Sequence, residues 1–269
     1  MQHNTTNAGI FYRKMGNGPA MVLLHGFPAD GTLWRNVWDE LAVSNTVIIP
    51  DLPGSGNSPL NGDAGMADLA ERINEVLAEE HIDKAVITGH SMGGYVAFAY
   101  AKLYPEKVAG LSLVHSTPAA DGDEKKKTRQ KSIELIQKGG KTQFIGQMVP
   151  NLFSDAVKQS NPMIVKEQIE RSMSVEAASI ISLYKGMMDR PDTSDVLNVA
   201  PFPVQWICGI DDNVIPYKKI LGKCHYSPIN FVTFYNNCGH MSMLEAPEQL
   251  TDDLKTFAMY SNRQLHLSQ

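Results

Sequence analysis

The chain has 269 residues, of which 43% are hydrophobic and 20% are charged, and its formal net charge is −5. This length suffices for one large α/β domain with an insertion, and the composition is ordinary for a soluble enzyme. The negative charge argues against nucleic acid and anionic membranes as partners. The apolar runs are no longer than a strand, so we expect no membrane span.

Residues 1–7 contain neither a basic region nor an apolar core, so they do not resemble a signal peptide. The three cysteines, Cys208, Cys224 and Cys238, are odd in number and have no paired spacing. That pattern fits a reducing compartment, and Cys238 is expected to be a buried thiol. We therefore expect a cytoplasmic protein.

The first part of the chain alternates short apolar runs, typical of buried strands, with amphipathic stretches, typical of helices. In chain order we expect a strand at 10–13 that forms one arm of a hairpin turning at 16–19, a strand at 21–25, a helix at 33–42, a strand at 46–49, a helix at 66–80, a strand at 85–88, a helix at 95–103 and a strand at 108–114. This order predicts an α/β fold with a mostly parallel, doubly wound sheet. Right-handed crossovers would bring the carboxyl ends of the strands to one edge, where loops build a site.

The alternation stops after Thr117, and residues 118–200 show only helical periodicity, as at 123–137 and 174–188. Strand patterns then resume at 203–207 and 229–235, followed by a helix at 247–260. We expect residues 1–117 and 201–269 to form the core domain. Residues 118–200 are expected to form a helical lid over the carboxyl edge of the sheet.

The sequence GHSMGG at residues 89–94 lies between a β-branched run and an alanine-rich, helix-like stretch. A serine at such a strand-to-helix turn forms the G-x-S-x-G nucleophile elbow. Side chains at Gly89 and Gly93 would collide with neighbouring backbone, while Ser91 is held strained with its hydroxyl exposed. The helix start then directs backbone N–H groups at the place where negative charge develops.

A serine nucleophile needs a base and an acid that orients the base. In this architecture they follow in the order serine, acid, histidine. His240 lies just past the last predicted strand, and the loop at 209–216 lies just past the preceding strand. We favour Asp212 as the acid because it stands in the middle of that loop. Asp211 is expected to cap the turn or face solvent.

The HGFP sequence at residues 25–28 follows an early strand, so the backbone N–H of Phe27 can point into the site. With the N–H of Met92 it would form an oxyanion hole, two donors matched to a tetrahedral intermediate. His25 is expected to be structural and His90 to pack beside the nucleophile. His115 ends a strand near the site and is a weaker rival base, because its position fits no known order of triad residues.

A cluster of basic residues on the helix at 123–137 is interpreted as a solvated face and not as a nucleic-acid patch, because acids precede it and aromatic residues are absent. Its members are Lys125, Lys126, Lys127, Arg129 and Lys131. No group of histidine, cysteine and aspartate has the spacing of metal ligands, so we expect no metal.

The chain resembles serine α/β-hydrolases of the esterase, lactonase and C–C hydrolase branch, in motifs spread over residues 10–260. The matching segments are 25–28, 51–58, 89–94, 209–216, 238–240 and 245–248. The resemblance implies a helical lid at 118–200, no cofactor, and a covalent acyl-enzyme. Epoxide hydrolases and dehalogenases share the HGFP loop but carry aspartate at the elbow, and Ser91 argues against both.

These residues predict a serine hydrolase that acts on a small carboxylic ester, thioester or lactone. The alternatives with the same triad are C–C bond hydrolysis of a diketone and cofactor-free perhydrolysis. A ligand-sensing protein that keeps the pocket but turns over slowly or not at all is a further alternative. Specificity is expected to lie in the lid side chains Phe144, Met148, Phe153, Met163, Met173, Tyr184, Met187 and Met188.

Overall fold

The computed structural model describes residues 1–62 and 64–267, and side chains up to residue 263. In this part of the chain, eight strands form one sheet in the order β1-β2-β4-β3-β5-β6-β7-β8. The strands are β1 Gln2–Thr5, β2 Phe11–Met15, β3 Ala20–Leu24, β4 Thr46–Pro50, β5 Ala85–His90, β6 Val108–Val114, β7 Val204–Gly209 and β8 Asn230–Tyr235. Only the pairings of β2 with β1 and with β4 are antiparallel. The predicted mostly parallel sheet is therefore confirmed.

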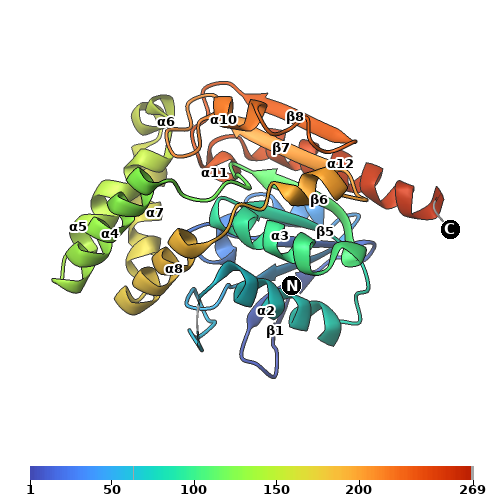
Figure 1. The fold of residues 1–269 in the computed structure, drawn as a ribbon, viewed down its shortest axis with the longest axis horizontal. Coiled ribbons are helices and arrows are strands. Elements are labelled where there is room, and N and C mark those ends of the chain that lie inside the picture. Colours follow the sequence, from blue (N-terminus) through green and yellow to red (C-terminus); the bar gives the residue numbers. More distant parts are fainter. Residues whose placement is uncertain (63, 268–269) are drawn as a thin grey trace.

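The helices pack on the sheet in layers (Figure 1). Helix α2 packs against α3, and α3 contacts β3, β5 and β6, whereas α12 contacts β6 and α1. The bounds outside the insertion are η1 Gly31–Trp34, α1 Trp38–Leu41, α2 Met66–Glu79, α3 Met92–Leu103, η2 Pro105–Lys107, α10 Tyr217–Leu221, α11 Ser242–Glu245 and α12 Pro247–Leu267. None of the helices in the described chain is long and apolar enough to cross a membrane.

A helical insertion separates β6 from β7, and Figure 1 shows its helices gathered at one end of the molecule. Its elements are α4 Asp123–Gln137, α5 Lys141–Met148, η3 Val149–Leu152, α6 Asp155–Ser160, α7 Pro162–Met173 and α8 Ala177–Asp189, followed by α9 Asp195–Val199. The expected helical insertion is confirmed for α4 to α8. The division into domains at 117/118 and 200/201 stays a prediction.

Two local expectations are wrong. Strand β2 does not pair with the strand that follows it, because β4 lies between them in the sheet. The turn at residues 16–19 instead crosses the segment before β4, where a Cβ at Gly16 would overlap the carbonyl oxygen of Ala42. The helix expected at 33–42 is broken into η1 and α1 because Val37 leaves the helical conformation, with φ −124° and ψ −22°.

The sheet interior explains why the apolar runs are continuous. Every residue of β3, β5, β6 and β7 is buried, as expected for parallel strands that are covered on both faces. Helix α3 is also buried from Met92 to Ala101. Its alanines let the helix approach the sheet closely, so the start of α3 is held firmly against the end of β5.

The turn between β5 and α3 is a tight contact of backbone on backbone. Ser91 has φ 52° and ψ −114°, a backbone conformation that residues other than glycine rarely adopt. A Cβ at Gly89 would overlap the carbonyl oxygen of Gly93, and a Cβ at Gly93 would overlap that of Leu24. Only glycine fits at both positions, as the sequence motif predicts.

We predict that Gly93→Ala lowers the free energy of unfolding by about 2 kcal/mol or more, because β3 and α3 must separate to admit the methyl group. Urea unfolding monitored by circular dichroism measures this change. Gly146→Ala is the matched control, since Gly146 is also helical and a Cβ there meets nothing within 4 Å. The control should be neutral or stabilise by up to about 1 kcal/mol. Equal destabilisation by both changes would contradict this account of the turn.

Candidate active site

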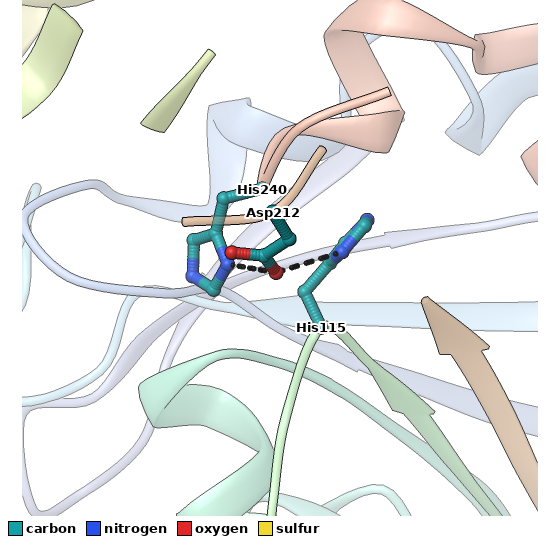
Figure 2. A group of neighbouring side chains, drawn as sticks. All are labelled: His115, Asp212 and His240. Carbon is teal, nitrogen blue, oxygen red and sulfur yellow. Dashed lines mark hydrogen bonds and ion pairs between the residues drawn. The ribbon is translucent and has the colours of Figure 1, made fainter. Parts of the chain in front are cut away.

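A histidine and a carboxylate meet at the carboxyl edge of the sheet. Asp212 lies in the loop after β7, and His240 lies in the loop after β8. The Nδ1 atom of His240 is 2.7 Å from Oδ2 of Asp212, and both side chains are buried (Figure 2). This hydrogen bond fixes the orientation of the imidazole ring and leaves Nε2 free to act as a base.

The Asp212 carboxylate is held by more than His240. Its Oδ1 atom accepts hydrogen bonds from the N–H groups of Val214 at 2.8 Å and Ile215 at 2.9 Å. Burial alone would raise the pKa of Asp212, but His240 and His115 outweigh it and hold the pKa well below its ordinary value. Asp212 is therefore ionised. Asp211, in contrast, is exposed.

His115, considered from sequence a weaker rival base, lies on the other side of the same carboxylate (Figure 2). Its Nδ1 atom is 3.2 Å from Asp212 Oδ2 and 3.2 Å from the backbone N of Gly209. Burial lowers the pKa of His115 despite the attraction of Asp212, so the ring is neutral. His240 lines the pocket that contains Ser91, and His115 does not.

His115, Asp212 and His240 are also the one group of potential metal ligands found among the described residues. Both Nδ1 atoms face a single carboxylate oxygen, at 2.7 and 3.2 Å. A tetrahedral metal with bonds of about 2.1 Å would hold its ligand atoms roughly 3.4 Å apart. The distance from His240 Nδ1 to Asp212 Oδ2 is shorter than that and is typical of a hydrogen bond. The geometry therefore fits a hydrogen bond better than metal coordination.

The histidines expected to be structural have well-defined partners. His25 is buried, its Nε2 accepts a hydrogen bond from the Leu52 N–H at 2.9 Å, and its Nδ1 lies 2.9 Å from the Gly26 carbonyl. His90 is buried, and its Nε2 donates to the carbonyl oxygen of His240 at 2.8 Å. Burial lowers the pKa of both rings, so both are neutral. His90 thereby positions the backbone of His240.

Glu245 has a role that the sequence analysis did not assign. Its Oε2 accepts from the N–H groups of Gly239 at 3.1 Å and Ser154 at 2.9 Å, and its Oε1 accepts from Met241 at 3.0 Å. The residues on both sides of His240 are thus bound by one carboxylate, which also holds the insertion at Ser154. A glutamate five residues after a histidine is the only sequence signal for it.

Ser91 and His240 open into a cavity of about 190 Å³ between the core and the insertion. Its wall consists of Phe27, Ser91, Tyr95, Lys125, Thr128, Arg129, Met148, Asn151, Leu152, Tyr184, Met187, Val214 and His240. The wall thus includes three of the side chains expected to bind substrate, Met148, Tyr184 and Met187.

The other expected lid residues lie elsewhere. Phe144 is buried behind the wall, with its ring centroid 5.5 Å from that of Tyr184. Phe153 is fully buried, Met188 is partly buried in the core, and neither lines the cavity. Met163 is 66% exposed. Met173 is partly buried against the core and is also absent from the wall.

The interpretation of the basic helix as a solvated face is wrong for Arg129, whose side chain is 11% exposed, whereas that of Lys125 is 37% exposed. Lys125 and Arg129, one turn apart on α4, line the cavity, and Arg129 Nε is 2.6 Å from the buried Asp121. Lys127 and Lys131 are exposed, as expected. The available signal was the spacing of four residues from Asp121 to Lys125 to Arg129, which puts them on one side of a helical segment.

The two backbone donors assigned to the oxyanion hole are free of other partners. Neither Phe27 N–H nor Met92 N–H donates a hydrogen bond within the described chain. Met92 is the first residue of α3, so its N–H carries part of the positive end of the helix dipole. Phe27 and Ser91 both line the cavity, and Met92 follows Ser91 directly.

Comparison with known proteins shows which families and structures the chain resembles. The dihydrolipoyllysine-residue acetyltransferase component of the acetoin cleaving system from Pseudomonas putida is 31% identical over 89% of this chain, which spans 63% of that relative's length. The pimeloyl-(acyl-carrier protein) methyl ester esterase of Pseudoalteromonas atlantica is 28% identical, over 90% of this chain and 95% of that protein. A malate-bound thermophilic esterase from Thermogutta terrifontis superposes with a TM-score of 0.91 at 28% identity, over 97% of this chain and 99% of that one.

The model of the family described as the alpha/beta hydrolase fold matches residues 19–247. The matched region includes the Ser91 turn, the Asp212 loop and the His240 loop. The chain therefore belongs to the alpha/beta hydrolase fold family.

Proposed function

We propose that this hydrolase cleaves a small carboxylic ester, thioester or lactone through an acyl-enzyme on Ser91. One observation carries the proposal. A serine in a strained strand-to-helix turn lines the same cavity as a histidine whose other ring nitrogen is bound to a buried carboxylate. That combination supplies a nucleophile, a base and the group that orients the base.

The first half of the reaction forms the acyl-enzyme. Ser91 Oγ attacks the carbonyl carbon while His240 Nε2 accepts the hydroxyl proton. Asp212 stabilises the imidazolium that results, because it stays ionised beside Nδ1. The N–H groups of Phe27 and Met92 donate to the oxyanion of the tetrahedral intermediate. Collapse of the intermediate breaks the bond to the leaving group, which takes the proton from His240.

The second half releases the acid. Water attacks the acyl carbon, and His240 Nε2 accepts a proton from it. The second tetrahedral intermediate expels Ser91, which regains its proton from His240. The cavity of about 190 Å³ supports a small acyl group, and its methionines at 148 and 187 can adapt to more than one shape. The esterase names of two relatives are consistent with this class of substrate.

We predict that Ser91→Ala lowers kcat on a short aryl ester such as p-nitrophenyl acetate by about 10⁴-fold or more, because no nucleophile remains. Stopped-flow and steady-state assays measure the burst and kcat, and circular dichroism checks the fold. Ser160→Ala changes an exposed serine on α6 and serves as the control. Retention of most activity by Ser91→Ala would overturn the nucleophile assignment. Absence of turnover in the wild type would favour a ligand-sensing protein.

We predict that Asp212→Asn lowers kcat by about 10³-fold or more, whereas Asp211→Asn changes it less than about threefold. An amide at position 212 can leave His240 in the wrong tautomer, while the side chain of Asp211 is exposed. The two variants are adjacent and lose the same charge, so each controls for the other. Equal losses on one ester, or a larger loss at Asp211, would refute the assignment of the acid.

We predict that dialysis against excess EDTA leaves kcat/KM unchanged. The reason is that Asp212 Oδ2 already accepts a hydrogen bond from His240 at 2.7 Å. The proposed chemistry also needs no metal ion to polarise the carbonyl group. Activity on one ester before and after dialysis gives the comparison, with addition of Zn²⁺ or Mn²⁺ as the second arm. Loss of activity that a divalent metal restores would mean that His115, Asp212 and His240 bind an ion.

A further inference from the structure

The catalytic cavity has positive charge on its wall and no carboxylate. Lys125 and Arg129 are the only lysine and arginine among the wall residues, and no aspartate or glutamate accompanies them. Both side chains come from α4, one turn apart. They share the cavity with Ser91 and His240. A substrate at Ser91 therefore meets a wall that carries two cationic side chains and no acid.

The carboxylate of Asp121, behind this wall, already pairs with two arginines. Asp121 is buried and lies 2.6 Å from Arg129 Nε and 2.9 Å from a guanidinium nitrogen of Arg190. Both guanidinium groups also lie over aromatic rings, Arg129 over Tyr184 at 4.8 Å and Arg190 over Tyr95 at 3.8 Å. These contacts fix the two arginines. One carboxylate therefore pairs with two arginines, and Lys125 is a third cation beside it.

Lys125 is the cation that is left over. Its Nζ lies 3.9 Å from Asp121 Oδ1, beyond hydrogen-bond distance, and makes no hydrogen bond to another described residue. Burial, together with the nearby Arg129, lowers the pKa of Lys125 to about 8. Its side chain is 37% exposed, so the ammonium group keeps contact with solvent but has no close acceptor on the protein. An anion bound in the cavity would provide the acceptor for Lys125 Nζ that the protein lacks.

A larger polar pocket lies beside the catalytic cavity, and Lys125 borders both. It has a volume of about 720 Å³ and shares Lys125 and Val214 with the catalytic cavity. Its cations, Lys125, Arg190, Lys219 and Lys223, are accompanied by Asp121, Asp123 and Glu124. These four cations and three acids leave one net positive charge there. Lys125 borders both pockets, but Ser91 and His240 line only the catalytic cavity, so we place the anion on that side.

We propose that the substrate carries a carboxylate which pairs with Lys125 while its ester carbonyl lies at Ser91. The matching class is the half-ester of a short dicarboxylic acid, or a lactone that bears a carboxylate. This inference rests on the proposed function for the position of the ester. It adds a specificity residue, Lys125, that recognises the charged end of the substrate and takes no part in bond breaking.

Binding to the Ser91→Ala protein tests the inference without turnover. Calorimetric titration compares monomethyl glutarate with its neutral primary amide. We expect the half-ester to bind about tenfold more tightly, with a preference that weakens as salt is added. In Ser91→Ala/Lys125→Met the ratio should fall close to one, and in Ser91→Ala/Lys125→Arg it should persist. Ser91→Ala/Lys127→Met is the control, because Lys127 is exposed on the same helix.

The outcomes separate the two proposals. Equal binding of the half-ester and the amide, or a preference that survives Lys125→Met, would overturn the role of Lys125. Lys125→Gln repeats the test if the methionine variant has a lowered melting temperature. Turnover of both compounds by the wild type is measured in parallel. If neither compound nor p-nitrophenyl acetate is hydrolysed, the proposed function fails, and the titration still decides whether Lys125 recognises a carboxylate.

Discussion

The carboxylate of Asp212 is the group around which the site is organised. A buried anion is tolerated only when its oxygens are hydrogen-bonded, and Asp212 has the N–H groups of Val214 and Ile215 on one oxygen and Nδ1 of His240 on the other. Two consequences follow from this arrangement. The carboxylate remains ionised, and it determines the direction in which the His240 ring faces the cavity. Nδ1 of His115 lies 3.2 Å from the same oxygen on the far side.

The insertion and the catalytic loops are built as one unit. The His240 N–H donates to the carbonyl oxygen of Leu152 at 2.7 Å, and Glu245 binds Ser154 as well as the residues that flank His240. On the other wall, the ring of Tyr184 lies 4.7 Å from that of Phe27. The proposed base, His240, and the proposed oxyanion donor, Phe27, thus both contact the insertion. Changes in its helices will therefore affect rate as well as specificity.

Local patterns predicted most of the elements, but they missed β1, the break at Val37 and the long-range pairing of strands. Residues 108–114 and 123–137 form β6 and α4 with the expected bounds, because one run is continuously apolar and the other has a clear acidic start. Asp212 and His240 could be expected together since the carboxyl ends of parallel strands share an edge. Nothing local shows that Glu245 binds Ser154, or that β4 lies between β2 and β3. Likewise, the position of Lys125 at the cavity depends on tertiary packing that local sequence patterns do not show.

We propose that Ser91 is the nucleophile of a triad assembled on Asp212. Reaction with diethyl p-nitrophenyl phosphate, followed by intact-mass measurement and peptide mapping, tests it most directly, because the reagent forms a stable adduct with an activated serine. We expect one diethylphosphoryl group, located on Ser91, and none in His240→Ala under the same conditions. An adduct at another residue, or equal labelling of Ser91 when His240 is absent, would contradict it.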